Sequence, residues 1–275
     1  MNCKNCHTEL QEQDDYCKSC GGKVIRNRLT FKNLFEHISE TFFNYDNKLL
    51  QTFIQLFKQP EDVIDGYITG TRKKYANVIS YFALAITISG FYLIIVNKYF
   101  PKTFDFSQMT ISGQEDFQKK NSTFVQEYQS ILMMLYVPLY AFMARITFFN
   151  IKKYNYTELL VIFMYIQAQI SIASAIVVIT LGVLGISSSI VGILMIPLMI
   201  IYTTYVLKRL LKLSASDIVV RTLLFSVVLG VTLIIITILC LVIMYLTGDL
   251  QETFGPAFEA GKKIGEEAAK AKSAN

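Results

Sequence analysis

Long runs of apolar residues occupy most of the chain after residue 78. Short polar segments divide them into five runs, at about 78–96, 130–149, 159–184, 188–207 and 219–246. Each run is near the ~20 residues that an α-helix needs to cross a ~30 Å hydrocarbon core. The pattern predicts an all-α polytopic membrane domain with five transmembrane helices over residues 78–247. Only residues 185–187 join the third and fourth runs, so we expect these helices to be antiparallel neighbours.

Residues 27–77 show a different periodicity. Apolar residues recur at helical spacing in two stretches, each opposite a polar face, which predicts two short amphipathic juxtamembrane helices. Two arrangements are open: the helices pack on each other or on the membrane domain, or they lie in the bilayer interface with their aromatic side chains immersed. The apolar positions are Leu34, Phe35, Ile38, Phe42, Phe43, Leu49, Leu50, Phe53, Ile54 and Phe57.

The two ends of the chain are polar. Residues 1–26 contain four of the five cysteines and form a separate module. Residues 248–275 are rich in Ala, Glu, Lys and Gly, a composition typical of a solvated helix or of disorder.

The composition excludes an ordinary soluble protein. Apolar residues make up 53% of the chain and charged residues 17%, against roughly 25% charged in typical globular domains. Residues 1–78 carry 11 Lys/Arg and 10 Asp/Glu. A nearly neutral N-terminal part argues against nucleic acid as a partner, because that binding needs a concentrated basic face.

Basic residues mark one side of the predicted bundle. Arg72, Lys73 and Lys74 precede the first run, Lys152 and Lys153 separate the second and third, and Lys208, Arg209 and Lys212 separate the fourth and fifth. The opposite side receives residues 97–129, with four basic and four acidic residues. Because positive charge prefers the cytoplasm, we expect a cytosolic N-terminus and an external C-terminus. The first residues also lack the pattern of a cleavable signal peptide, which agrees with this orientation.

The strongest motif is a pair of Cys-x-x-Cys turns. Cys3 and Cys6 are followed after ten residues by Cys17 and Cys20, and Gly21 comes next. Two such turns can close a tetrahedral site, so the four cysteines predict one structural Zn²⁺ ion in a zinc ribbon. Roughly twenty residues cannot bury a stable core, so the metal would hold the module together. The alternative, two redox-active dithiols, lacks the strand–helix setting of a thioredoxin site.

Little else in the sequence suggests catalysis. A four-cysteine site has no open coordination position, and no familiar metalloprotease, phosphate-loop or serine-elbow motif occurs. His7 adjoins Cys6, but four cysteines already fill the site. Cys240 lies in the fifth run, where a thiol acts as a small apolar group. We therefore expect no catalytic residues, no cofactor beyond the zinc ion and no enzymatic activity.

A few polar residues fall within the apolar runs, where charge is costly. Arg145 near the end of the second run and Glu158 at the start of the third are candidates for an ion pair. The alternative is that Arg145 extends to the interface and Glu158 lies among headgroups. Gln167, Gln169 and Pro197 suggest a polar interior, although helix packing explains them equally well.

Several of these features together resemble an uncharacterised bacterial family of multi-pass membrane proteins with an N-terminal zinc ribbon. The residues that carry the resemblance are Cys3, Cys6, Cys17 and Cys20-Gly21; Leu50-Gln51-Thr52-Phe53, Leu56 and Pro60; Tyr67 to Tyr75; and Asn155-Tyr156-Thr157-Glu158. Members often have a histidine after this glutamate, where this chain has Leu159. The five-span layout is also similar to that of the Yip family of membrane-trafficking proteins. The resemblance implies a location in the bacterial cytoplasmic (inner) membrane.

Two functions remain open at this stage. The first is an interaction or organising protein whose cytosolic zinc ribbon binds a protein partner, with membrane lipids around the bundle and homo-oligomerisation left open. The second is a small-solute or ion transporter or channel with a regulatory zinc ribbon, and with a hydrated path along Arg145, Glu158, Gln167 and Gln169.

Overall fold

The computed structural model describes residues 1–22, 48–99, 115–185 and 188–248, together with Val24, Thr30, Gly255 and Lys262. The chain divides into two units, Met1–Asn47 and Lys48–Asn275, which are considered separately below. The first expected amphipathic helix and nearly all of the C-terminal tail lie outside the described residues.

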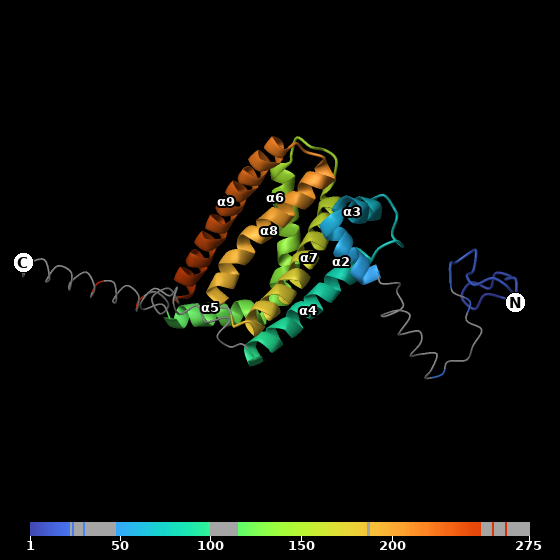
Figure 1. The fold of residues 1–275 in the computed structure, drawn as a ribbon, viewed down its shortest axis with the longest axis horizontal. Coiled ribbons are helices and arrows are strands. Elements are labelled where there is room, and N and C mark those ends of the chain that lie inside the picture. Colours follow the sequence, from blue (N-terminus) through green and yellow to red (C-terminus); the bar gives the residue numbers. More distant parts are fainter. Residues whose placement is uncertain are drawn as a thin grey trace, which may run out of the picture. The chain divides into compact units, whose positions relative to one another are not determined.

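The described part of the second unit consists of helices joined by turns and contains no strand (Figure 1). Five of its helices are long and apolar enough to cross a membrane, which confirms the predicted fold class and indicates a multi-pass membrane protein. The helices in chain order are α2 (Lys48–Lys58), α3 (Pro60–Ile68), α4 (Val78–Tyr99), α5 (Glu115–Glu127), α6 (Gln129–Thr147), α7 (Tyr156–Val183), α8 (Ser188–Leu211) and α9 (Ala215–Thr247).

Helix ends follow capping chemistry more closely than hydropathy. α7 begins three residues before the apolar run because Asn155 and Glu158 form a capping box, in which each side chain accepts a backbone N–H of the other residue. α9 likewise begins four residues early, where the Ser214 hydroxyl accepts the Asp217 N–H. These polar first turns extend both helices beyond their apolar runs.

Helix α7 lies at the centre of the second unit. It packs against α4, α6 and α8, and it contributes more buried residues than any other described helix. Its buried side chains are mainly branched aliphatic residues, joined by Phe163 and Tyr165. The antiparallel pairing expected for α7 and α8 is present (Figure 1).

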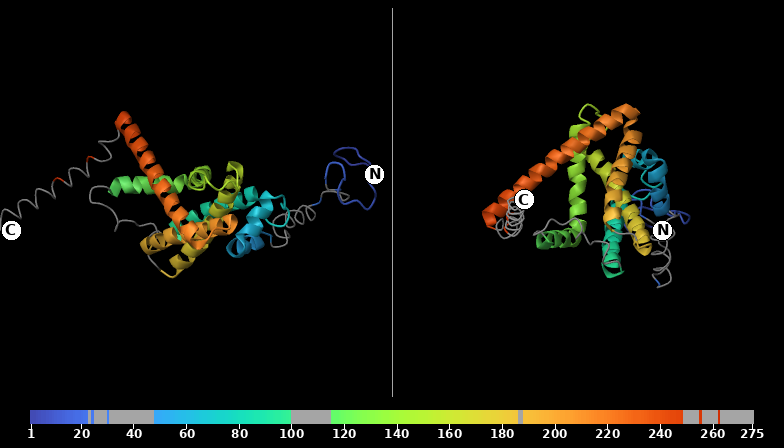
Figure 2. Two further views of the ribbon diagram at one scale, coloured as in Figure 1. Left: turned by 90° about the horizontal axis from the view of Figure 1, so that it is seen from above. Right: turned by 60° about the vertical axis from the view of Figure 1, so that its left-hand side comes forward.

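Helix α9 packs only along its first half. Ile218 is buried and Phe225 contacts the core, but nearly every residue beyond Leu229 is exposed. Figure 2 shows α9 diverging from the other long helices toward its C-terminal end. Such an all-apolar surface is stable in lipid, because hydrocarbon tails solvate it as well as other side chains do.

Helix α5 was not predicted. Its sequence is strongly polar, so the hydropathy pattern placed it within a long connection between the first two spans. In Figure 1 it runs across the end of the bundle and leads directly into α6.

The helix predicted around Leu49–Phe57 corresponds to α2. It packs on the membrane bundle together with α3, and Leu56, Val63 and Ile64 are completely buried. Leu50 and Ile54 remain exposed on the opposite face. Packing against the membrane domain, one of the two expected arrangements, is therefore confirmed for this helix.

A buried polar chain fastens α2 to α4 and α7. Gln169 of α7, fully buried, donates to the Phe53 carbonyl at 2.9 Å and accepts from the Tyr81 hydroxyl of α4. The Thr52 hydroxyl accepts the Ala76 N–H at 2.9 Å, and the Tyr165 hydroxyl donates to the Ala76 carbonyl at 2.8 Å. Burial of these groups is tolerated because each one has a partner.

We expect Gln169→Leu to destabilise the protein by about 1–2 kcal/mol, because it leaves the Tyr81 hydroxyl without its buried acceptor. Unfolding in mixed detergent micelles measures the change. Gln167→Leu is the control, since Gln167 is only half-buried and has no hydrogen-bond partner among the described residues. Equal effects of the two substitutions would contradict the structural role of Gln169.

Candidate metal centre and the polar network around α3

The four N-terminal cysteines lie together in the first unit. Their sulfur atoms are all within 4.8 Å of one another. Cys3 Sγ lies 3.6 Å from Cys20 Sγ, and Cys6 Sγ lies 3.5 Å from Cys17 Sγ. Four thiolates around one zinc ion at ~2.3 Å would be roughly 3.8 Å apart. The cluster could therefore hold a single metal ion with little rearrangement.

The two Cys-x-x-Cys turns have the same backbone hydrogen bonds. In the first, the His7 N–H donates to the Cys3 carbonyl at 2.9 Å and the Cys3 N–H to the Thr8 carbonyl at 2.9 Å. In the second, the Gly21 N–H donates to the Cys17 carbonyl and the Cys17 N–H to the Gly22 carbonyl, both at 2.8 Å. The chain thus presents two equivalent pairs of thiols.

Both turns need a left-handed residue after the second cysteine. Gly21 has φ +69° and His7 has φ +59°. Glycine adopts this conformation freely, whereas a residue with a side chain is strained by roughly 1–2 kcal/mol. The closed cluster of four cysteines does not include His7, which is exposed.

The local structure favours the ionised form of two of the four thiols, Cys6 and Cys20. The Thr8 hydroxyl, 3.2 Å from Cys6 Sγ, lowers the pKa of the Cys6 thiol to about 6, together with the Thr8 backbone N–H. The Gly22 backbone N–H and the Asn5 side chain lower the pKa of Cys20. Cys3 and Cys17 are buried beside Leu10, which forms the small apolar core of this unit. Thiolates are the ligand form of cysteine, so this environment suits a metal site.

The second unit has a cluster of carboxylates on α3. Asp62 accepts the Lys74 ammonium at 2.7 Å and the hydroxyl of the adjoining Tyr75. Asp65 accepts the Lys153 ammonium at 3.1 Å and the hydroxyl of the adjoining Tyr154. The same Asp–Lys–Tyr arrangement therefore occurs twice, with two different connecting segments.

The third carboxylate of this cluster binds α8. Glu61 pairs with the Arg209 guanidinium through both carboxylate oxygens. This contact and the two Asp contacts join α3 to the segment before α4, the α6–α7 connection and the end of α8. The three basic segments thus lie at the same end of the helix bundle.

Further contacts satisfy the carbonyl groups at two helix ends. The Tyr202 and Tyr205 hydroxyls donate to the Leu56 and Lys58 carbonyls at the end of α2. The Lys153 ammonium also donates to the Leu210 carbonyl at 2.6 Å, near the end of α8. A cation at this position complements the negative end of the helix dipole.

Sequence reasoning did not identify this network. Glu61 and Asp65 are four residues apart, on the face of a short helix that begins at Pro60. That spacing, together with three basic segments downstream, is a signal that could have suggested it. The ion pair considered between Arg145 and Glu158 is not formed: Arg145 is exposed and Glu158 completes the α7 capping box.

These features define a multi-pass membrane protein with a cysteine cluster that could bind a metal ion. Residues 46–90 match a family described as Protein of unknown function (DUF3667). The described part of the matched segment comprises α2, α3, the basic segment after them and the first half of α4. No curated protein and no solved structure matches the chain.

We expect the chain to bind one Co²⁺ ion, detected by its thiolate charge-transfer absorption, and Cys17→Ser to abolish tight binding. His7→Gly is the matched control beside the cluster. It should bind Co²⁺ normally and change stability by no more than about 1 kcal/mol, because relief of backbone strain offsets the greater chain entropy of glycine. Loss of Co²⁺ from this control would show that His7 takes part in the site.

Acid should weaken the α3 network. Arg209 lowers the pKa of Glu61 from its ordinary 4.5, and Lys74 and Tyr75 lower the pKa of Asp62 from 3.8. A carboxyl group whose pKa is lowered by folding stabilises the protein at pH values above its ordinary pKa. This contribution is lost as the pH falls through the pKa of the folded protein. We expect the midpoint temperature of thermal unfolding to decrease as the pH is lowered below 4.5. The decrease should be smaller in a Glu61→Gln/Asp62→Asn double variant.

The double variant should also unfold at a lower temperature than wild type at neutral pH. Glu127→Gln provides the control, because Glu127 is exposed and forms no ion pair among the described residues. Parallel pH curves for wild type and the double variant would contradict the assignment.

Proposed function

We propose that this chain is a non-enzymatic integral membrane protein of the bacterial cytoplasmic membrane, and that its zinc ribbon binds a protein partner or organises the membrane around it. The observation that carries the proposal is the closed cluster of four cysteine sulfurs within 4.8 Å of one another. A metal held by all four has no open position for a substrate or water. The metal is then structural, and function lies on the surface that it stabilises.

Zinc is the metal that best suits this donor set. Four thiolates in a tetrahedron favour a redox-inert ion with no geometric preference of its own. Among the described residues of the first unit, the buried side chains are Cys3, Leu10 and Cys17. Such a small core is compatible with a fold that depends on metal binding.

The exposed side chains of the first unit suit a protein partner. Tyr16, next to Cys17, is 61% exposed. Lys4 and Lys18 occupy equivalent positions in the two turns and are both exposed. An exposed tyrosine on a rigid support is typical of the residues that dominate protein interfaces.

The end of the bundle that carries the basic segments supports an internal N-terminus. Lys74, Lys153 and Arg209 converge there on α3. If the positive-inside rule holds, this end faces the cytosol, and α9 then runs to the external side. The zinc ribbon would accordingly meet a cytosolic partner.

The transporter alternative receives less support. Arg145 is exposed and Glu158 caps α7. Gln169 is fully buried, and both the oxygen and the nitrogen of its side-chain amide are hydrogen-bonded. Only Gln167 lines the cavity described below. The residues expected along a hydrated path therefore do not share one.

Affinity capture from gently solubilised membranes tests the proposed interaction. A specific partner should be recovered with wild type and lost with Cys17→Ser, while the variant remains in the membrane fraction. Tyr16→Ala should keep the metal and reduce recovery of the same partner by about tenfold, as for a central interface aromatic. His7→Gly should recover it as wild type does.

Recovery of that partner with the metal-free variant would refute a role for the zinc ribbon. Capture of the same set of proteins by wild type and by Cys17→Ser would also argue against the proposal.

A further inference from the structure

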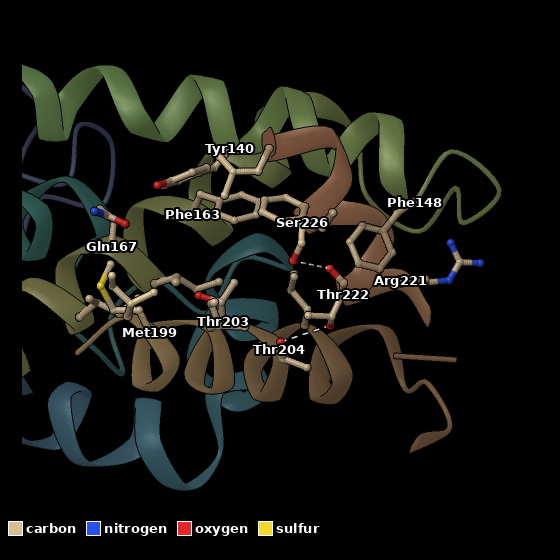
Figure 3. Close-up of a pocket in the computed structure, with 17 residues that line it drawn as sticks. Tyr140, Phe148, Phe163, Gln167, Met199, Thr203, Thr204, Arg221, Thr222 and Ser226 are labelled. Atoms are coloured by element: carbon tan, nitrogen blue, oxygen red, sulfur yellow. Dashed lines mark hydrogen bonds between the residues drawn. The ribbon is translucent and has the colours of Figure 1, made fainter. Parts of the chain in front are cut away.

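A cavity of about 230 Å³ lies among the membrane-spanning helices α6, α7, α8 and α9. Its walls are mainly aliphatic and aromatic, including Tyr140, Phe163, Met199 and Phe225. Figure 3 shows Thr204, Thr222, Ser226 and Arg221 toward one end of the cavity, and Gln167 near Met199 at the other end. The cavity is partly open, so an occupant could enter from outside the bundle.

The cavity is elongated along the helices. On α8 its lining extends from Ile196 to Leu207, which is roughly 16 Å at 1.5 Å per residue. Half of a ~30 Å hydrocarbon core has the same length. The dimensions therefore suit one acyl chain that reaches from an interface to the bilayer centre.

Among the described residues that line the cavity, Arg221 is the only charged one. Its Nη1 donates to the Thr147 carbonyl at the end of α6, and its guanidinium lies 5.5 Å from the centre of the Phe148 ring. In Figure 3 the guanidinium extends past Phe148 at one end of the cavity. Within the described ranges, no carboxylate forms an ion pair with it, so none of these residues neutralises its charge.

Three hydroxyl groups near Arg221 have hydrogen-bond partners within the protein. Thr204 and Thr222 share a hydrogen bond of 3.2 Å, and Ser226 donates to the Thr222 carbonyl at 3.0 Å. This part of the wall needs little water, so it suits hydrocarbon better than a polar solute. Lys208 lies one helical turn after Thr204, on the same face of α8. It is a second cation near this end of the cavity, after Arg221 of α9.

We propose that this cavity binds an anionic glycerophospholipid, with one acyl chain between α7, α8 and α9 and the phosphate on Arg221. The location of Arg221 agrees with this assignment. Thr147 ends α6 just before the basic α6–α7 connection, so the guanidinium lies at the end of the bundle where the basic segments gather. The site is independent of the cysteine cluster and of any protein partner.

The test uses the full chain in nanodiscs of phosphatidylcholine and phosphatidylglycerol in equal parts. After mild detergent extraction, native mass spectrometry counts the retained lipids. Wild type should retain one phosphatidylglycerol in preference to phosphatidylcholine. Arg221→Gln should reduce this preference by about tenfold, the value of one charge-assisted hydrogen bond.

Arg145→Gln is the charge control, because Arg145 is also near the end of α6 but lies outside this cavity. It should retain the lipid as wild type does. Loss of lipid to the same extent in both Arg variants would show general attraction of headgroups and overturn the proposal. Equal retention of the two lipids by wild type would also overturn it.

A second pair of variants tests the acyl-chain site. Ser226→Phe fills the cavity and should exclude both lipids. Val227→Phe adds the same ring at the next residue, which is exposed and does not line the cavity, and should change nothing. Retention of the lipid by Ser226→Phe would overturn the proposed location even if Arg221 matters. Each variant is checked for wild-type unfolding so that a folding defect is not read as lost binding.

Discussion

The carboxylates of Glu61, Asp62 and Asp65 bind basic side chains from three separate segments that meet at one end of the bundle. Isolated surface ion pairs contribute little, typically less than about 1 kcal/mol each. Here they act as a group, with tyrosine hydroxyls and helix-terminal carbonyls in the same network. Their importance is geometric, because one short helix fixes the spacing of α4, α7 and α8. The hydrogen bond from the buried Gln169 to the Phe53 carbonyl then fastens α2 to α7.

This arrangement gives a physical meaning to the segment that matches the family of unknown function. Residues 46–90 contain all three carboxylates, Thr52 of the buried polar chain and the start of the first span. Asp62 and Thr52 find partners within this segment, in Lys74 and Ala76. Glu61 and Asp65 instead bind Arg209 and Lys153, which come from elsewhere in the chain. The matched segment is thus the organising part of the membrane unit, and the cysteine cluster lies outside it.

The sequence was informative wherever the physics is local. Hydropathy alone located the five spans, and Cys-x-x-Cys spacing brought Cys3, Cys6, Cys17 and Cys20 together, because each turn is determined by adjacent residues. The α3 network was not predicted, since Asp65 and Lys153 are 88 residues apart and only packing makes them neighbours. The polar sequence of α5 concealed this helix. An Arg145–Glu158 pair was considered as one of two alternatives, because hydropathy does not show that Glu158 caps α7. The lipid cavity depends on how four helices pack, and no single helix reveals it.

The loose packing of α9 makes the bundle sensitive to the thickness of its membrane. This helix has 33 residues, roughly 50 Å at 1.5 Å per residue, which exceeds a ~30 Å hydrocarbon core. A helix that is too long for its bilayer tilts. Because most described residues in the second half of α9 are exposed, thinning or thickening of the bilayer changes the tilt with little loss of protein contact. The first half of the same helix forms one wall of the cavity, so the width of that cavity varies with bilayer thickness.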